Sequence, residues 1–166
     1  KAEKAFDDLT RLATYICPTP MAAISLIDSD RQWFKSKVNI DVPETPRSVA
    51  FCAHAILQPG TLVVPNALED IRFKDNPFVA AEGGVRFYAG SPLTTTEGYK
   101  LGTLCVIDKV PRQLSDGQLA ALRALSRQVT TQLELRREIK ELHARIRALE
   151  LSTGEKTQEL SISMVR

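Results

Sequence analysis

The apolar spacing near the carboxyl terminus constrains the fold of this chain more than any other feature. One apolar face recurs at helical intervals: Leu119, Leu122, Leu125, Val129 and Leu133. A second set follows at spacings of four, three, four and three residues: Leu135, Ile139, Leu142, Ile146 and Leu149. The first set predicts a helix that packs on a sheet, and the second predicts a heptad seam. The domain that buries the first set cannot also bury the seam.

The seam therefore needs another helix, most simply the same helix of a second chain, which predicts a homodimer. Charged residues separate its apolar positions, as a coiled coil requires. The alternative is an amphipathic helix that folds back on its own sheet. The polar composition after Leu151, with Gly154, predicts a break in the helix. We therefore expect a domain over 1–133, a coiled-coil helix over 134–150, and a polar linker or the start of an output region over 151–166.

Composition indicates an ordinary globular protein. A chain of 166 residues, with 43% hydrophobic and 25% charged residues, suits one domain with a sizeable core. The net charge of +2 and the 6% aromatic content favour neither nucleic acid nor an anionic membrane as a partner. No apolar run approaches the roughly 20 residues that span a bilayer. Three widely spaced cysteines and the lack of a signal-peptide pattern predict a cytoplasmic location, and a start without Met predicts a fragment of a longer protein.

The remaining segments predict helices and strands in a mixed order. Apolar spacing predicts a helix over 2–16, and residues 49–57 predict a short helix that Ser48 caps. Ser115 is the expected cap of the long helix. The predicted strands are 22–28, 32–38, 62–66, 85–95 and 99–108. Strand alternation puts Lys35 and Ser36 on opposite faces.

The order of these segments resembles the GAF domain family. Five stretches carry the resemblance in the family's order, from about residue 5 to residue 133: AISLIDSDRQWFKS, TPRSVAFCAHAI, LVVPNALEDIRFKDNP, VRFYAGSPL and YKLGTLCVID. The resemblance implies an α+β fold, with the terminal helices on one face of a five- to six-stranded, mostly antiparallel sheet. Short helices and loops would cover the other face and enclose a small-molecule pocket. It also implies a sensory domain that signals through a dimeric helix to an output domain in the same chain, of the sensor kinase or cyclic-di-GMP enzyme type.

Several ligands known from this family are not expected here. The segment NPFVAAEGG lacks the cysteine to which phytochrome-like members attach a bilin, and the signature of cyclic-nucleotide-binding members is absent. Haem would have only His54 as an axial ligand within the domain, and a zinc site lacks enough ligands. The cofactor is therefore unknown. The alternatives are a ligand-less dimerisation module and an enzyme that resembles reductases of free methionine sulfoxide, which the gaps of 35 and 53 residues between the cysteines disfavour.

We expect aromatic and polar side chains near the 66–84 loop to line the pocket. The candidates are Trp33, Phe34, Phe51, His54, Phe73, Asn76, Tyr88, Ser91, Thr103 and Cys105. No catalytic residue or metal ligand is assigned. Residues two apart on a helix point about 200° away from each other. Cys52 is therefore expected to face the core and His54 to face away, so the two cannot act as a dyad.

Overall fold

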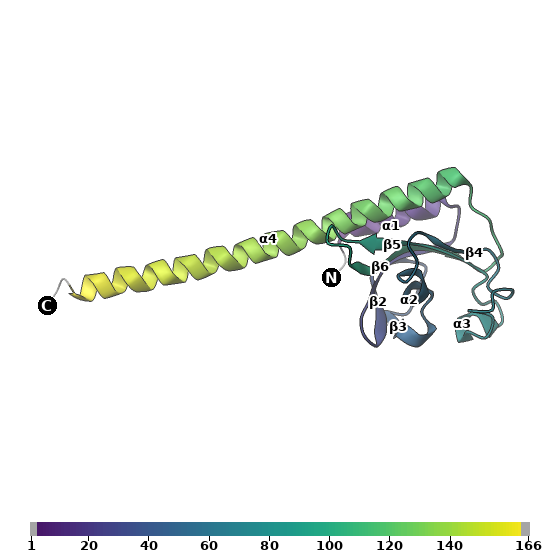
Figure 1. Cartoon of the computed structure of the whole chain (residues 1–166), viewed down its shortest axis with the longest axis horizontal. Helices are drawn as coiled ribbons and strands as arrows, with labels where there is room; N and C mark the ends of the chain where they lie inside the picture. The colour runs from purple at the N-terminus through teal and green to yellow at the C-terminus, as the bar shows by residue number, and fades with distance from the viewer. Residues whose placement is uncertain (1–2, 164–166) are drawn as a thin grey trace. The chain divides into compact units, whose positions relative to one another are not determined.

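The computed structural model describes residues 3–163 and is built around a six-stranded antiparallel sheet (Figure 1). The strand order is β3–β2–β1–β6–β5–β4. The strands are β1 (Met21–Ile27), β2 (Arg31–Val38), β3 (Glu44–Pro46), β4 (Leu62–Val64), β5 (Phe87–Thr94) and β6 (Lys100–Asp108). The helices are α1 (Lys4–Ile16), the 3-10 turn η1 (Arg47–Val49), α2 (Phe51–Ala55), α3 (Pro77–Ala80) and α4 (Asp116–Ser163). The predicted α+β fold is confirmed.

The centre of the sheet is apolar on both faces because helices or loops cover both. β1 lies between β2 and β6, and residues 22–25 on it are all buried. On one face, α1 buries Phe6 and Ala13, and the first turns of α4 bury Leu122 and Val129. α2 and α3 lie on the opposite face (Figure 1). This second face holds the candidate site.

The start of α4 has the cap that the sequence predicts. The backbone amide of Gln118 donates to Ser115 Oγ at 3.2 Å, and the Gln118 side-chain oxygen accepts from the Ser115 amide at 2.9 Å. This reciprocal pair is a capping box, which satisfies two amides that the first helical turn leaves free. The capping box sets where the helix begins.

Three local predictions are wrong. Ser48 does not cap α2, because a 3-10 turn intervenes and Ala50 takes the N-cap position without a side-chain bond. Part of the predicted loop before it forms the edge strand β3, which pairs with β2. α4 does not break at Gly154 but continues to Ser163. One glycine costs a helix only about 1 kcal/mol, which the helix-forming residues on either side offset.

A bulge in β2 also changes the predicted alternation. Ser25 pairs with Phe34 and Ile24 pairs with Ser36, so Lys35 is an extra residue on this strand. Lys35 and Ser36 consequently both contact the start of α1, Lys35 through its N-cap residue Glu3 at 2.7 Å and Ser36 through Asp7 at 2.6 Å. The bulge sends two consecutive side chains to the helix face and leaves Phe34 on the other.

Gly102 lies where β6 passes closest to β1. A Cβ atom at this position would overlap the carbonyl oxygen of Ser25. This oxygen belongs to the backbone of β1, so it can move away only if the two central strands separate. We expect Gly102→Ala to lower the free energy of unfolding in urea by about 2–3 kcal/mol. Gly60→Ala is the matched control, because a Cβ there meets no atom within 4 Å. Equal losses in both variants would contradict this account.

Residues 131–163, which are the rest of α4, belong to a second compact unit. The five apolar side chains of the predicted seam are exposed in this unit, by 43% to 68%: Leu135, Ile139, Leu142, Ile146 and Leu149. They are thus available to a partner helix, which the prediction of a seam requires. Within residues 3–163, no helix combines the length and apolarity needed to cross a membrane.

Candidate functional site

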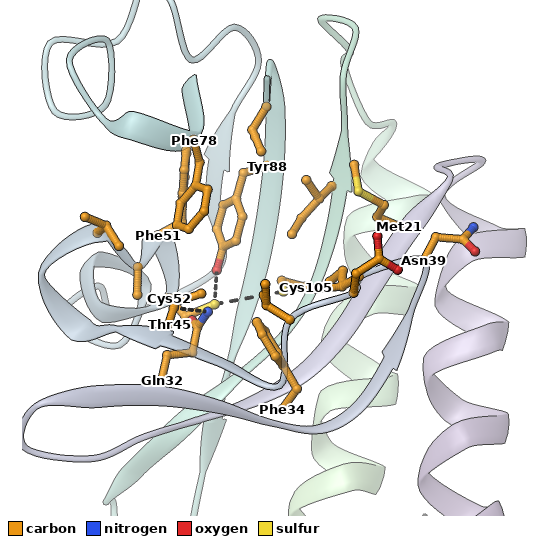
Figure 2. A pocket seen from close by; sticks show the side chains of 17 residues that line it. Met21, Gln32, Phe34, Asn39, Thr45, Phe51, Cys52, Phe78, Tyr88 and Cys105 are labelled. Carbon is orange, nitrogen blue, oxygen red and sulfur yellow. Dashed lines mark hydrogen bonds between the residues drawn. The ribbon is translucent and has the colours of Figure 1, made fainter. Parts of the chain in front are cut away.

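A cavity of about 290 Å³ lies between the sheet and α2 (Figure 2). It is lined mainly by apolar side chains from β1, β2, β5, β6 and α2 and from the segments beside them. The lining residues are Met21, Gln32, Phe34, Asn39, Ile40, Asp41, Val42, Thr45, Val49, Ala50, Phe51, Cys52, Phe78, Val85, Tyr88, Cys105 and Ile107. Only Asp41 among them is charged. Such a lining suits an uncharged, largely apolar molecule.

Two cysteines lie together in the wall of this cavity. The Cys52 sulfur on α2 is 3.9 Å from the Cys105 sulfur on β6, and both residues are buried. The Tyr88 hydroxyl donates to Cys52 Sγ at 3.3 Å, as Figure 2 shows, and the Thr103 hydroxyl donates at 3.1 Å. Cys105 instead donates its own proton to the Ala23 carbonyl oxygen at 3.6 Å. Within the pair, Cys52 is placed to donate to the Cys105 sulfur, and Cys52 is also the sulfur that accepts from two hydroxyl groups.

This arrangement separates the pKa values of the two thiols. Burial raises the pKa of Cys52, but its hydrogen bonds with Cys105, Ser25, Thr103 and Tyr88 outweigh burial and lower the pKa to about 6. The hydrogen bond with Cys52, together with burial, raises the pKa of Cys105 well above its ordinary value. The first negative charge of the pair consequently belongs on Cys52.

A stack of aromatic rings supports the α2 side of the cavity. The rings of Phe51 and Phe73 are parallel within 10°, with centroids 4.2 Å apart. Phe51 also packs against Tyr88, whose ring centroid is 5.1 Å away. Gly90 makes room for this tyrosine, because a Cβ atom at position 90 would overlap the phenol ring. The stack therefore holds the Tyr88 hydroxyl in place against Cys52.

The cavity has one buried polar corner, formed by β2 and β3. Gln32 Nε2 donates to Thr45 Oγ1 at 3.3 Å, and both side chains are buried. The other polar atom of this amide, Oε1, accepts no hydrogen bond from any residue that the structure describes. Buried acceptors are normally satisfied, so this atom is a suitable contact for a donor group on a ligand.

The structure brings about half of the predicted site residues together. Phe34, Phe51, Tyr88 and Cys105 line the cavity. Thr103 and Phe73 lie behind its wall and contact Cys52 and Phe51, respectively.

The other four candidates do not line the cavity. Trp33 faces a separate groove beside α1, and Ser91 bonds Ser126 of α4 at 2.9 Å on the helix face. His54 packs edge-on against Phe73, on the outer side of α2. Asn76 caps α3 by accepting from the Phe78 amide, and it donates to the Val49 carbonyl oxygen. It therefore has a structural role.

Cys52, Gln32 and Thr45 are cavity residues that the sequence analysis missed. Gln32 shares the parity of Phe34 on β2, which is a signal that could have identified it. Cys52 was expected in the core, which its burial confirms. As expected, His54 points away from Cys52, since it packs against Phe73. The gap of 53 residues between Cys52 and Cys105 does not keep their sulfurs apart, because the chain brings α2 back over β6.

The site offers little to a metal ion. No group of three or more His, Cys, Asp or Glu side chains with suitable placement occurs in the described part of the chain. The lining therefore offers apolar contact, two thiols, the carboxylate of Asp41, and the amides and hydroxyls of the other polar residues for hydrogen bonding.

Comparison with known proteins gives a consistent family. The GAF domain profile matches residues 1–133. A curated relative, "Cyclic di-GMP phosphodiesterase PA2567" of Pseudomonas aeruginosa, is 44% identical over 133 residues, which are 80% of this chain. The match covers only 23% of that relative.

Solved structures agree on the fold. The GAF domain of a Coxiella burnetii phosphoenolpyruvate-protein phosphotransferase has a TM-score of 0.69 at 11% identity, covering 83% of this chain and 85% of that one. Free methionine-R-sulfoxide reductase of Neisseria meningitidis has a TM-score of 0.66 at 16% identity, covering 82% and 80%. Identities this low establish the fold alone.

Proposed function

We propose that this chain, which belongs to the GAF domain family, is a regulatory domain that binds a small, uncharged molecule and signals as a homodimer through α4. The observation that carries the proposal is the cavity of about 290 Å³ between the sheet and α2. Its apolar wall would bury the body of a ligand. The free Gln32 Oε1 would accept one hydrogen bond and orient it.

The proposed relay of the signal, from the ligand to the output region, follows from two roles of α4, which packs on the sheet and also carries the seam. Its first turns bury Leu122 and Val129, and the same helix continues into the exposed apolar seam. A ligand that shifts the packing of these first turns would change the register or crossing angle of two paired helices. Dimerisation through a coiled coil is therefore part of the proposal.

The output is proposed to lie in the same polypeptide. The chain spans less than a quarter of the Pseudomonas relative, which is named as a cyclic-di-GMP phosphodiesterase. We infer an output region of the cyclic-di-GMP enzyme type, in a protein of the cytoplasm. The GAF domain itself would be regulatory and would not perform the catalysis.

Ligand binding can be tested with the neutral fluorophore N-phenyl-1-naphthylamine, whose emission rises in apolar sites. We expect saturable binding to the unmodified protein. Ile107→Trp places a large ring in the cavity, since Ile107 lines it, and should weaken the fluorophore's affinity by at least about 10-fold. Ile71→Trp, at a side chain that is 83% exposed, is the matched control and should bind normally. Equal binding by both variants would place the fluorophore elsewhere and refute this cavity as the ligand site.

A further inference from the structure

The paired cysteines have a chemistry that reversible ligand binding does not use. Their sulfurs are 3.9 Å apart, and both residues line the cavity. A disulfide needs a separation of about 2.05 Å. Sidechain rotation and a small shift of α2, a helix of five residues, would have to supply the difference.

We propose that Cys52 and Cys105 form a reversible disulfide when an organic hydroperoxide enters the cavity, so that the domain carries a thiol switch. This inference does not depend on the proposed binding of a regulatory ligand. Cys52 is the attacking sulfur, because two hydroxyl groups donate to it, from Tyr88 and Thr103. Cys105 is the resolving thiol, because it lies in reach and keeps its proton, which it donates to the Ala23 carbonyl oxygen.

The steps balance as two successive displacements. The Cys52 thiolate attacks the outer oxygen of the hydroperoxide, the O–O bond breaks, and the alkoxide takes up the proton that Cys52 gave up. The product at Cys52 is a sulfenic acid. Cys105 then attacks this sulfur, the disulfide forms, and hydroxide leaves with the Cys105 proton as water. Two thiols are oxidised, and the hydroperoxide is reduced to an alcohol and water.

The lining of the cavity selects the class of oxidant. Phe34, Phe51 and Ile107 present apolar surface, and none of the described residues that line the cavity is cationic and could attract an anionic oxidant. An uncharged peroxide with an apolar body therefore partitions into the cavity more favourably than hydrogen peroxide. Oxidation would draw α2 toward β6 and move Phe51, which α2 carries. The disulfide would thus change the shape of the cavity wall and the packing of Phe73, on which Phe51 stacks.

The test is intact-mass analysis of the reduced protein treated with cumene hydroperoxide. We expect a loss of about 2 Da in the monomer, reversed by dithiothreitol. Cys105→Ser should stop at the sulfenic acid, with a gain of about 16 Da that dimedone traps. Cys52→Ser should consume peroxide at least about 100-fold more slowly.

Hydrogen peroxide at the same concentration should react about 10-fold more slowly than cumene hydroperoxide if the cavity concentrates the apolar oxidant.

Cys17→Ser is the matched control, because Cys17 is buried beside Gln118 on the helix face and should not affect the reaction. Circular dichroism verifies the fold of each variant, and alanine at positions 52 and 105 replaces serine if either serine variant unfolds. A Cys52 variant that reacts as fast as the unmodified protein, or a disulfide that requires Cys17, would overturn the proposal. Equal rates with the two peroxides would overturn entry through the apolar cavity.

Discussion

Replacing Leu142 and Ile146 with glutamate is expected to convert a dimer into a monomer. In a paired seam each side chain would be buried against the partner helix, and burial of a large aliphatic side chain contributes about 1.5–3 kcal/mol. One dimer loses four such side chains and gains four charges at its centre. We therefore expect the dissociation constant to rise by at least about 1000-fold, measured by light scattering over a concentration series.

The control places the same charges on the outer face of the same helix. Ala144→Glu and Ala148→Glu are also four residues apart, but the heptad that assigns Leu142 and Ile146 to the seam puts them outside it. This variant should stay dimeric at micromolar concentration. If the seam variant also stays dimeric, then another surface joins the chains, and the proposed relay through α4 is wrong.

Phe73→Ala should cause the largest loss of stability among single truncations near the cavity. Phe73 is 1% exposed and stacks on Phe51, so its removal leaves a void that the short elements around it cannot fill. We expect the free energy of unfolding to fall by about 3–5 kcal/mol, measured in urea. The collapse of the stack should also release Tyr88 from its position against Cys52.

Phe78→Ala is the corresponding control. This phenylalanine lies five residues farther along the same covering segment, lines the cavity and is 41% exposed. Because much of its ring already contacts solvent, its truncation should cost less than about 1.5 kcal/mol. A similar loss in both variants would show that the segment as a whole, rather than the buried stack, stabilises this face.

Much of the fold could be predicted because it depends on local patterns. The apolar spacing of α1 and of the first turns of α4, the Ser115 cap and the two central hairpins all lie within short stretches of sequence. Prediction from local patterns failed where one extra residue reverses the alternation of side chains between the two faces of a strand. The extra residue Lys35 turns Ser36 toward α1, and nothing in the strand's apolar alternation marks that bulge.

The site was predicted less completely because a cavity is a property of packing. Alternation puts Trp33 and Phe34 on opposite faces of their strand, but it could not tell which face the covering loops would leave partly unfilled. Ser91 has the composition of a pocket residue and instead bonds Ser126. His54 attracts notice in a sequence, yet it packs on the outer side of α2 against Phe73.

The sequence by itself determined the order of the helices and strands, the resemblance to GAF domains and the apolar seam, because each depends on periodicity along the chain. Only the tertiary structure decided that Cys52 and Cys105 are neighbours and that Tyr88 and Thr103 both donate to Cys52. These contacts join elements separated by up to 53 residues, and their distances depend on how α2 closes over the sheet. No local pattern encodes that closure, since packing of the whole core produces it.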